Sequence, residues 1–179
     1  ATVSPATLTF TEDNWNTAQT VTLTGVDDND RDRNQDYKIS LTAAQQDPDG
    51  SEVTTLAGSS YGFTDATGTS AKFYYPRATT NYGTNLYVVD TNNHKIRKIV
   101  IATGVVTTLA GSSSGSTDGT GTSAKFNNPR GITTDGTNLY VVDTNNHRIR
   151  KIVIATGVVT TLAGSSSGST DGTGTSAKF

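Results

Sequence analysis

The chain of 179 residues contains neither cysteine nor methionine, and only 7% of its residues are aromatic. Because cysteine is absent, disulfide bonds, thiolate zinc sites and dithiol redox pairs are excluded. The longest apolar runs have four residues, as at 99–102, whereas a membrane-spanning helix needs about 20. We therefore expect no membrane insertion. Since no methionine opens the sequence, we interpret Ala1 as a processed or trimmed end.

Small polar residues take the place of the missing apolar ones. The chain has 34 Thr, 18 Gly, 16 Ser and 13 Asn residues, which together make up nearly half of it. Threonine is β-branched and fits a pleated strand, whereas glycine, asparagine and serine favour turns. This mixture predicts an all-β fold of short strands and tight loops, and it excludes a helical bundle.

Charge divides the sequence into two parts. Residues 1–52 hold ten acidic and three basic residues, a balance of −7, whereas residues 53–179 hold six and eleven, a balance of +5. The division predicts two modules and permits acidic-to-basic contact between them or between copies of the chain. The low aliphatic content is typical of secreted, repeat-rich proteins, so we expect an extracellular or cell-surface location.

A long repeat dominates the second part of the chain. VTTLAG occurs at 53–58, 106–111 and 159–164, a spacing of 53 residues each time. Residues 53–105 and 106–158 are identical at 43 of 53 positions. Repeats of this length are typical of architectures in which similar units stack on one another.

Each repeat has the pattern of a small antiparallel sheet. Turn signals of the types DG, NN and ATG separate runs of apolar or β-branched residues, which lie at 129–135, 138–144, 147–154 and 158–164. The pattern predicts four antiparallel strands per repeat. Because such a sheet has two apolar faces, neighbouring units must stack on it, as propeller blades do.

The residues of the repeat also match a known pattern. A start of the form Phe-x-x-Pro-x-Gly, a centre Leu-Tyr-Val-x-Asp and an end Asn-x-x-Ile-x-Lys are formed by Phe126, Pro129, Gly131, Tyr140, Asp143, Asn146, Ile149 and Lys151. The preceding repeat keeps this pattern except for Ala78 in place of the glycine. Residues 53–179 therefore resemble NHL repeats, which implies blades of a β-propeller.

The resemblance implies two complete blades, at 73–111 and 126–164, with a leading strand at 53–58 and a partial repeat at 165–179. Two blades cannot close a ring. Either the chain is a segment of a longer protein, or blades from several chains complete one another, because open strand edges invite pairing with another chain.

The acidic part of the chain predicts a second, incomplete sheet module. Alternating apolar residues, which indicate three strands, are Leu8, Phe10, Val21, Leu23, Tyr37, Ile39 and Leu41. With a Ser-Pro start, an Asn-Trp-Asn turn and an acidic loop, residues 1–44 resemble the C-terminal half of the immunoglobulin-like, Calx-β-like domains of bacterial surface proteins. Residues 45–52 are the expected linker.

Five carboxylates crowd the acidic loop: Asp27, Asp28, Asp30, Asp32 and Asp36. Clustered oxygen ligands suit a hard cation, so the loop is a candidate calcium site, and Calx-β-like domains often bind calcium. Arg31 and Arg33 interrupt the cluster, and the alternative is a solvated acidic turn. We expect no other cofactor.

The first repeat differs from the second mainly in its aromatic residues. The positions that carry Ser, Asn or Asp in the second repeat carry Tyr61, Phe63, Tyr74, Tyr75 and Tyr82 in the first. Aromatic side chains supply much of the contact area in interfaces. We predict that these residues contact the N-terminal module or a neighbouring chain; a carbohydrate or peptide site is the alternative.

Other polar residues of the repeat are assigned structural roles. His94 and His147 are each the only histidine of their blade and lack a second ligand, so neither metal binding nor catalysis is expected. Asp90 and Arg97 are expected to pair across adjacent strands, as are their counterparts in the second repeat. Basic residues alternate along strands rather than gathering in loops, so no nucleic acid binding is expected.

These features predict a non-enzymatic extracellular repeat protein that acts in self-assembly or adhesion. Chains would share strands or blades and so build a surface structure or a fibre. The alternative is a fragment of a large adhesin whose propeller binds a protein or glycan ligand. A propeller enzyme with metal-bound histidines is a more remote alternative.

Overall fold

The computed structural model of the chain describes residues 2–4, 20, 22–24 and 53–179. It divides into two units, 1–53 and 54–179. In the first unit, β1 (Thr2–Ser4) and β2 (Thr22–Thr24) form an antiparallel pair. β2 contains Leu23 of one expected strand, whereas β1 was not predicted. The strands expected at 8–10 and 37–41 and the five aspartates of the acidic loop lie outside the described residues.

The second unit begins with a four-stranded antiparallel sheet, which we call the first blade. Its strands β3 (Pro76–Tyr82), β4 (Asn85–Asp90), β5 (Lys95–Val100) and β6 (Val105–Ala110) pair in the order of the chain. Consecutive hairpins explain this order, because short polar turns connect β-branched runs. One turn passes through η2 (Thr91–Asn93) and ends at His94 in the left-handed region, with φ 55°.

The second blade repeats this arrangement with one added strand. Its strands are β8 (Gly131–Thr134), β9 (Asn138–Asp143), β10 (Arg148–Val153) and β11 (Val158–Ala163). The short strand β7 (Gly119–Thr120) pairs with the outer edge of β11. The predicted all-β class and the four antiparallel strands per repeat are confirmed, whereas β7 was not predicted.

The expected leading strand at 53–58 is absent: no strand forms there. The same sequence does form β6 and β11, which pair with β5 and β10 of their own blades. Among residues 53–179, no such neighbouring strand lies beside 53–58. A strand needs a partner for its backbone hydrogen bonds, so the local sequence alone is insufficient.

Side chains alternate between the two faces of each blade, and the faces have different partners. We call the face of the first blade that carries Val88, Ile99 and Val106 its leading face; the preceding loop covers it with Ala57, Ala66, Ala71 and Phe73. The opposite, trailing face of the first blade packs on the leading face of the second. The buried residues of this junction are Tyr87, Val89, Ile96, Ala110, Ala124, Phe126, Leu139, Val141, Ile152 and Val159. Each fully buried valine or isoleucine side chain contributes about 1.5–3 kcal/mol.

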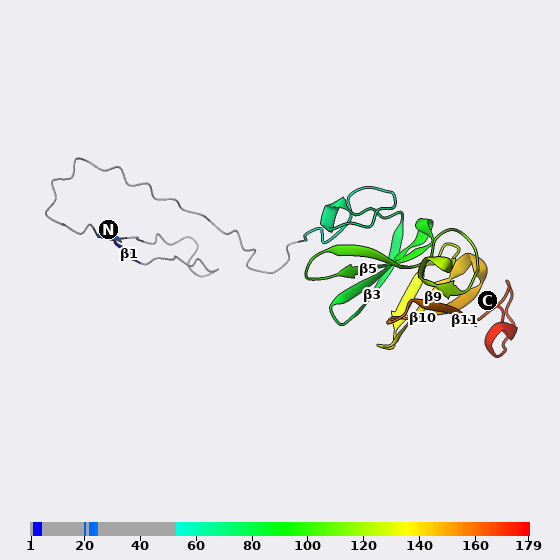
Figure 1. Ribbon diagram of the computed structural model, residues 1–179. Coiled ribbons are helices and arrows are strands. Elements are labelled where there is room, and N and C mark those ends of the chain that lie inside the picture. The colour runs from blue at the N-terminus through cyan, green and yellow to red at the C-terminus, as the bar shows by residue number, and fades with distance from the viewer. Residues whose placement is uncertain (1, 5–19, 21, 25–52) are drawn as a thin grey trace. The chain divides into compact units, whose positions relative to one another are not determined.

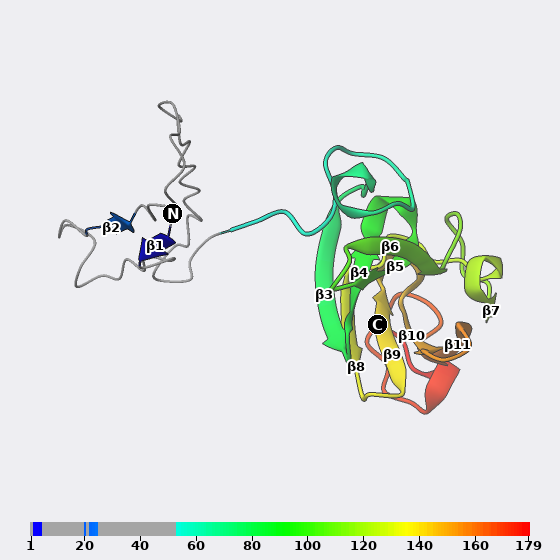
Figure 2. The same cartoon turned by 60° about the vertical axis from the view of Figure 1, so that its left-hand side comes forward.

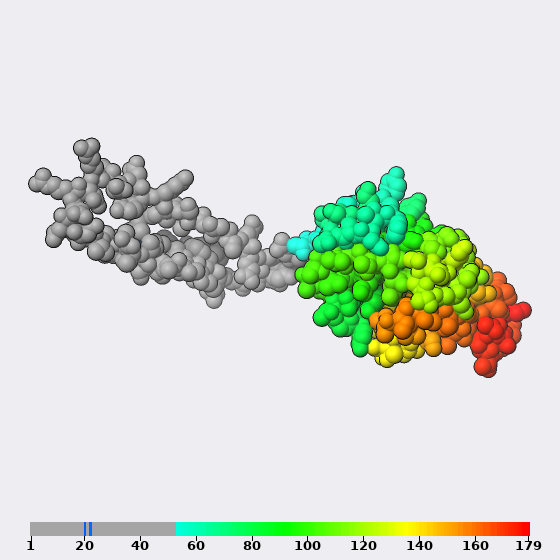
Figure 3. Space-filling model, viewed as in Figure 1, coloured from blue at the N-terminus to red at the C-terminus, as the bar shows by residue number. Residues whose placement is uncertain are grey.

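The loop that precedes the first blade and the residues that follow the second lie at opposite ends of the unit 54–179. Figure 1 shows them in cyan and red with both blades between them, and the space-filling view in Figure 3 agrees; in the turned view of Figure 2 the red segment overlaps the second blade, and the cyan loop lies at the far side of the first. The unit therefore has two distinct ends. Within the part of the chain that the structure describes, no helix has the length and apolar character needed to cross a membrane.

Candidate interaction surface

Two hydrogen bonds hold the junction between the blades in register. The hydroxyl of Thr91 donates to the carbonyl oxygen of Pro129 at 2.8 Å. The backbone N–H of Asn128 donates to Nδ1 of His94 at 3.1 Å. Burial, together with the positive charge of Lys95, lowers the pKa of His94 below its usual 6.5, although Asp143 acts in the opposite direction. The neutral ring that accepts this bond is therefore favoured.

Three copies of one phenylalanine show what the junction buries. Phe126 lies between the two blades and is fully buried. Phe73, which has a blade on one side only, is half-buried. Phe179, which no blade follows among the described residues, is 52% exposed. Identical residues thus differ in burial because their neighbouring blades differ.

The trailing face of the second blade repeats the trailing face of the first but lacks its cover. Val142 is 43% exposed, whereas its counterpart Val89 is fully buried in the junction. Leu162 is 46% exposed, and Tyr140 and Ile149 are only partly buried. The same residues that pack one blade on the next therefore form an unpartnered apolar surface at this end of the described unit.

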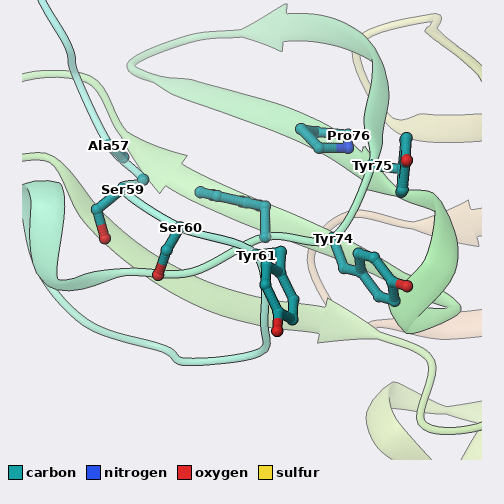
Figure 4. A pocket seen from close by; sticks show the side chains of 9 residues that line it. Ala57, Ser59, Ser60, Tyr61, Tyr74, Tyr75 and Pro76 are labelled. Atoms are coloured by element: carbon teal, nitrogen blue, oxygen red, sulfur yellow. The ribbon is translucent and has the colours of Figure 1, made fainter.

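The opposite end of the unit carries a hollow of about 610 Å³, lined by residues 57–61 and 73–76. Figure 4 shows Tyr61, Tyr74 and Tyr75 around it. The counterparts of several lining residues are buried at the junction between the blades: Ala110 and Phe126 are fully buried, and Pro129 is buried. The hollow is thus the space that a preceding blade occupies in the second repeat.

The five aromatic residues specific to the first repeat do not form one patch. Tyr61 and Tyr74 have ring centroids 5.8 Å apart, and Tyr74 and Tyr75 are 5.5 Å apart. Phe63 instead lies beneath the charged groups of Lys95 and Arg97.

Tyr82 lies elsewhere, beside the turn at Gly136 in the second blade. A Cβ atom added to Gly136 would lie 3.4 Å from the ring of Tyr82. Its counterpart Asp135 closes that turn, because its carboxylate accepts hydrogen bonds from the backbone N–H groups of Thr137 and Asn138 and from the hydroxyl of Tyr140. These bonds hold the pKa of Asp135 well below its usual value.

Tyr75 has an unfavourable backbone conformation. Its φ is 54°, in the left-handed region, where its counterpart Asn128 has φ 49°. Asparagine tolerates this region, whereas a bulky residue is rare there. The tyrosine therefore costs stability at a position where the second repeat has a compatible residue.

Buried arginines tie each blade to the loop that precedes it. Arg97 bonds Asp90 at 2.7 Å, as predicted across adjacent strands, and also Asp65 in the loop at 2.6 Å. Arg150 does the same with Asp143 at 2.8 Å and Asp118 at 2.7 Å. Both guanidinium groups are fully buried. Removal of either partner of such a pair is strongly destabilising, because the other charge is left buried without a partner. These pairs therefore hold the loop on the blade.

The loop aspartates were not predicted as ion-pair partners. Burial by itself would raise the pKa of Asp118, but hydrogen bonds from the backbone and hydroxyl of Thr161 and from Arg150 outweigh it and lower the pKa below its usual value. The 32-residue separation of Asp118 and Arg150 hid the contact from local pattern analysis. The same pair occurs one repeat earlier, as Asp65 with Arg97. The presence of both residues in each repeat is the sequence signal from which the contact could have been predicted.

Metal ligands do not cluster in the described part of the chain, where no group of three or more His, Asp or Glu side chains is placed to hold an ion. His94 lies in the junction described above, and His147 occupies the corresponding corner of the second blade, with φ 53°. The candidate calcium ligands lie outside the described residues.

Comparisons with known proteins agree with this geometry. Residues 126–152 match the family model described as NHL repeat. The chain is 39% identical over 82 residues to NHL repeat-containing protein 2 of Gallus gallus, and 38% identical over 108 residues to the protein of the same name from Homo sapiens. The matches cover 46% and 57% of this chain, which spans only 11% and 15% of the length of these relatives.

A solved structure is also similar to part of this chain. An auxiliary nutrient binding protein from Bacteroides ovatus ATCC 8483 superimposes with a TM-score of 0.51 at 28% sequence identity, and the match covers 59% of this chain and 28% of that one. The predicted resemblance of the repeats is confirmed at the level of the fold. Residues 126–152 thus match the NHL repeat, and the second unit resembles a propeller-like arrangement of NHL-type blades.

Proposed function

We propose that this chain is a non-enzymatic assembly module, in which blades of separate copies stack as the two blades of one copy do. The observation that carries this proposal is the trailing face of the second blade. Its residues Tyr140, Val142, Ile149 and Ala163 are the counterparts of the four that the first blade buries in the junction, yet Val142 and Leu162 are 43% and 46% exposed.

The energy available to such stacking is that of the internal junction. Four side chains of the first blade, Tyr87, Val89, Ile96 and Ala110, are buried there, and apolar burial stabilises by about 25 cal/mol per Å². Contact between chains must also offset a loss of translational and rotational freedom that the tethered junction does not incur. Association is therefore expected to depend on concentration.

Sedimentation velocity of the 179-residue chain over a range of concentrations tests the proposal. We expect species larger than one chain, and we expect Val142→Asp to abolish them, because the carboxylate would be buried in the new contact. Ile101→Asp is the matched control, since Ile101 is 42% exposed but lies in the turn between β5 and β6. A chain that stays monomeric at every concentration would contradict the proposal.

The polar groups of the repeat support a role without catalysis. Arg97, Arg150 and their carboxylate partners are engaged in holding loops on blades. An extracellular or cell-surface location, and a role in adhesion through such assemblies, are part of the same proposal. Labelling of intact source cells with an antibody against residues 53–179 tests the location; signal that requires permeabilised cells would contradict it.

A second candidate function is ligand binding by a completed propeller. It is favoured by the similarity to a protein named as an auxiliary nutrient binding protein. Calorimetric titration of the chain with soluble glycans and peptides, under conditions in which it is associated and in which it is monomeric, tests this function. Heat of binding confined to the associated state is expected, and no binding in either state would refute it.

A further inference from the structure

The segment 165–179, which we call the tail segment, is a third copy of the loop that holds each blade. Its sequence is identical to that of 112–126, and it differs from 59–73 at three positions. It also has the same local fold, since η5 (Gly174–Ser176) corresponds to η3 (Gly121–Ser123) and packs on β11 as η3 packs on β6. The tail segment is therefore a preformed loop.

The groups by which the other two copies bind a blade make no such contacts with the described residues in the tail segment. Asp65 and Asp118 each bind a buried arginine of the following blade, whereas Asp171 is exposed and makes no ion pair with any described residue. Phe73 and Phe126 lie under the guanidinium groups of Arg97 and Arg150, with distances of 4.9 and 5.1 Å from Cζ to the ring centroid. Phe179 is 52% exposed.

The leading face of the first blade has the same apolar residues as the face to which the identical loop 112–126 binds. Its residues Leu86, Val88, Ile99 and Val106 are identical to Leu139, Val141, Ile152 and Val159, which pack against residues 112–126 and the blade before them. At present this face is covered by 57–73 of its own chain, without a preceding blade. Two nearly identical loops can therefore serve one face.

The two loops are anchored unequally. Residues 53–58, which lead into the first loop, form no strand, and Val53 is 96% exposed. The tail segment instead follows β11, which is paired with β10. When the first loop is released, no strand pairing of residues 53–58 is broken, because none exists. When the tail segment binds, the trailing face of the blade to which it is attached comes into contact as well.

We propose that copies of this chain join head to tail by loop exchange: the tail segment of one copy displaces residues 59–73 from the leading face of the first blade of the next. Asp171 then pairs with Arg97, and Phe179 takes the place of Phe73. The trailing face of the second blade is covered at the same time. This inference rests on the proposed function, because it specifies how the blades of separate copies stack.

The corner bonds of the internal junction recur in this arrangement. Thr144 and His147 correspond to Thr91 and His94, and Tyr75 and Pro76 correspond to Asn128 and Pro129. The hydroxyl of Thr144 therefore donates to the carbonyl of Pro76 in the next copy, and the N–H of Tyr75 donates to His147. Residues 74–76 are not displaced, so Tyr74 and Tyr75 add aromatic contact area that a junction between separate chains needs more than a tethered one.

Each copy that joins by loop exchange still has one free donor surface or one free acceptor surface, so further copies can be added. The donor and acceptor surfaces differ and lie at opposite ends of the unit (Figures 1 and 3). A contact of this heterologous type builds an open filament unless the rotation closes it into a ring.

Matched substitutions in two copies of one aspartate test the exchange, because their effects on association have opposite signs. Asp171→Asn weakens the incoming loop, and we expect it to raise the dissociation constant at least about tenfold, as the loss of charge-assisted bonds implies. Asp65→Asn weakens the resident loop and is expected to lower the dissociation constant. Sedimentation velocity measures both, and urea unfolding followed by circular dichroism checks that each variant is folded.

A peptide with the sequence of residues 165–179 supplies a second measurement that needs no folded variant. Added to the wild-type chain, it is expected to occupy the leading face and reduce association, whereas the same peptide with Asp171→Asn has little effect. Absence of any difference between the two peptides would contradict the exchange.

The outcomes separate this inference from the proposed function. If the wild-type chain is monomeric, both fail. If it associates and Val142→Asp abolishes association, but the two aspartate variants are neutral or change association in the same direction, the blades stack without loop exchange and only this inference fails. Opposite changes in the two variants support both.

Discussion

The three copies of one phenylalanine allow the energy of the blade junction to be measured within a single chain. We predict that replacing each with alanine destabilises the second unit in the order Phe126, then Phe73, then Phe179. Phe126 is fully buried and lies under Arg150. Truncation of a fully buried phenylalanine costs about 3–5 kcal/mol, since it removes buried apolar surface and leaves a cavity.

The other two positions are expected to cost less. Phe179 is 52% exposed, so its removal loses about half of the apolar burial and leaves no sealed cavity, for a cost of about 1 kcal/mol. Phe73 packs in the core under the first blade and is half-buried, and its cost falls between these values.

Urea unfolding followed by circular dichroism measures these differences. The chain is kept dilute enough to be monomeric, so that association neither displaces Phe73 nor buries Phe179. Similar losses for all three variants would refute the reasoning, because they would show that local loop packing, rather than the neighbouring blade, decides what each phenylalanine contributes.

Two further predictions concern single residues of the junction and of the hollow. His94 has a lowered pKa in the folded chain, so the stability that depends on its neutral ring is fully present above pH 6.5 and decreases as the pH falls below that value. In urea titrations between pH 7 and 5, we expect the free energy of unfolding of His94→Asn to fall less with pH than that of the wild-type chain. The same pH profile in both proteins would speak against the assignment. Tyr75→Asn places in the first repeat the residue that the second has at the same left-handed position, and the free energy of unfolding of the monomer is expected to rise by about 1 kcal/mol. A destabilised monomer would show that Tyr75 has packing contacts that outweigh its backbone strain.

Much of the fold follows from short-range features of the sequence. Strands β8 to β11 lie within the apolar runs between turn signals, because period-two alternation and β-branched residues favour strands wherever a partner strand follows by a short turn. The pairing of Asp90 with Arg97 followed for the same reason, since the two residues lie on strands joined by one hairpin.

The candidate site was less predictable, because it depends on contacts between distant residues. The bonds of Asp65 and Asp118 to buried arginines cross a whole loop, and no local period reports them. Comparison of the repeats identified the aromatic residues of the first repeat, yet only Tyr61, Tyr74 and Tyr75 lie at the hollow. Phe63 lies against Arg97 instead, and Tyr82 is at the far end of β3.

The sequence by itself determined the repeat, its strands and the all-β class, since these depend on side-chain pattern and on neighbours close in the chain. Only the tertiary structure decided the environment of each copy. VTTLA lies within strands at 106–110 and 159–163 but forms no strand at 53–57, and one phenylalanine is buried, half-buried or exposed in its three copies. Burial and strand pairing are properties of the neighbours that a residue acquires on folding, so identical residues can differ in both.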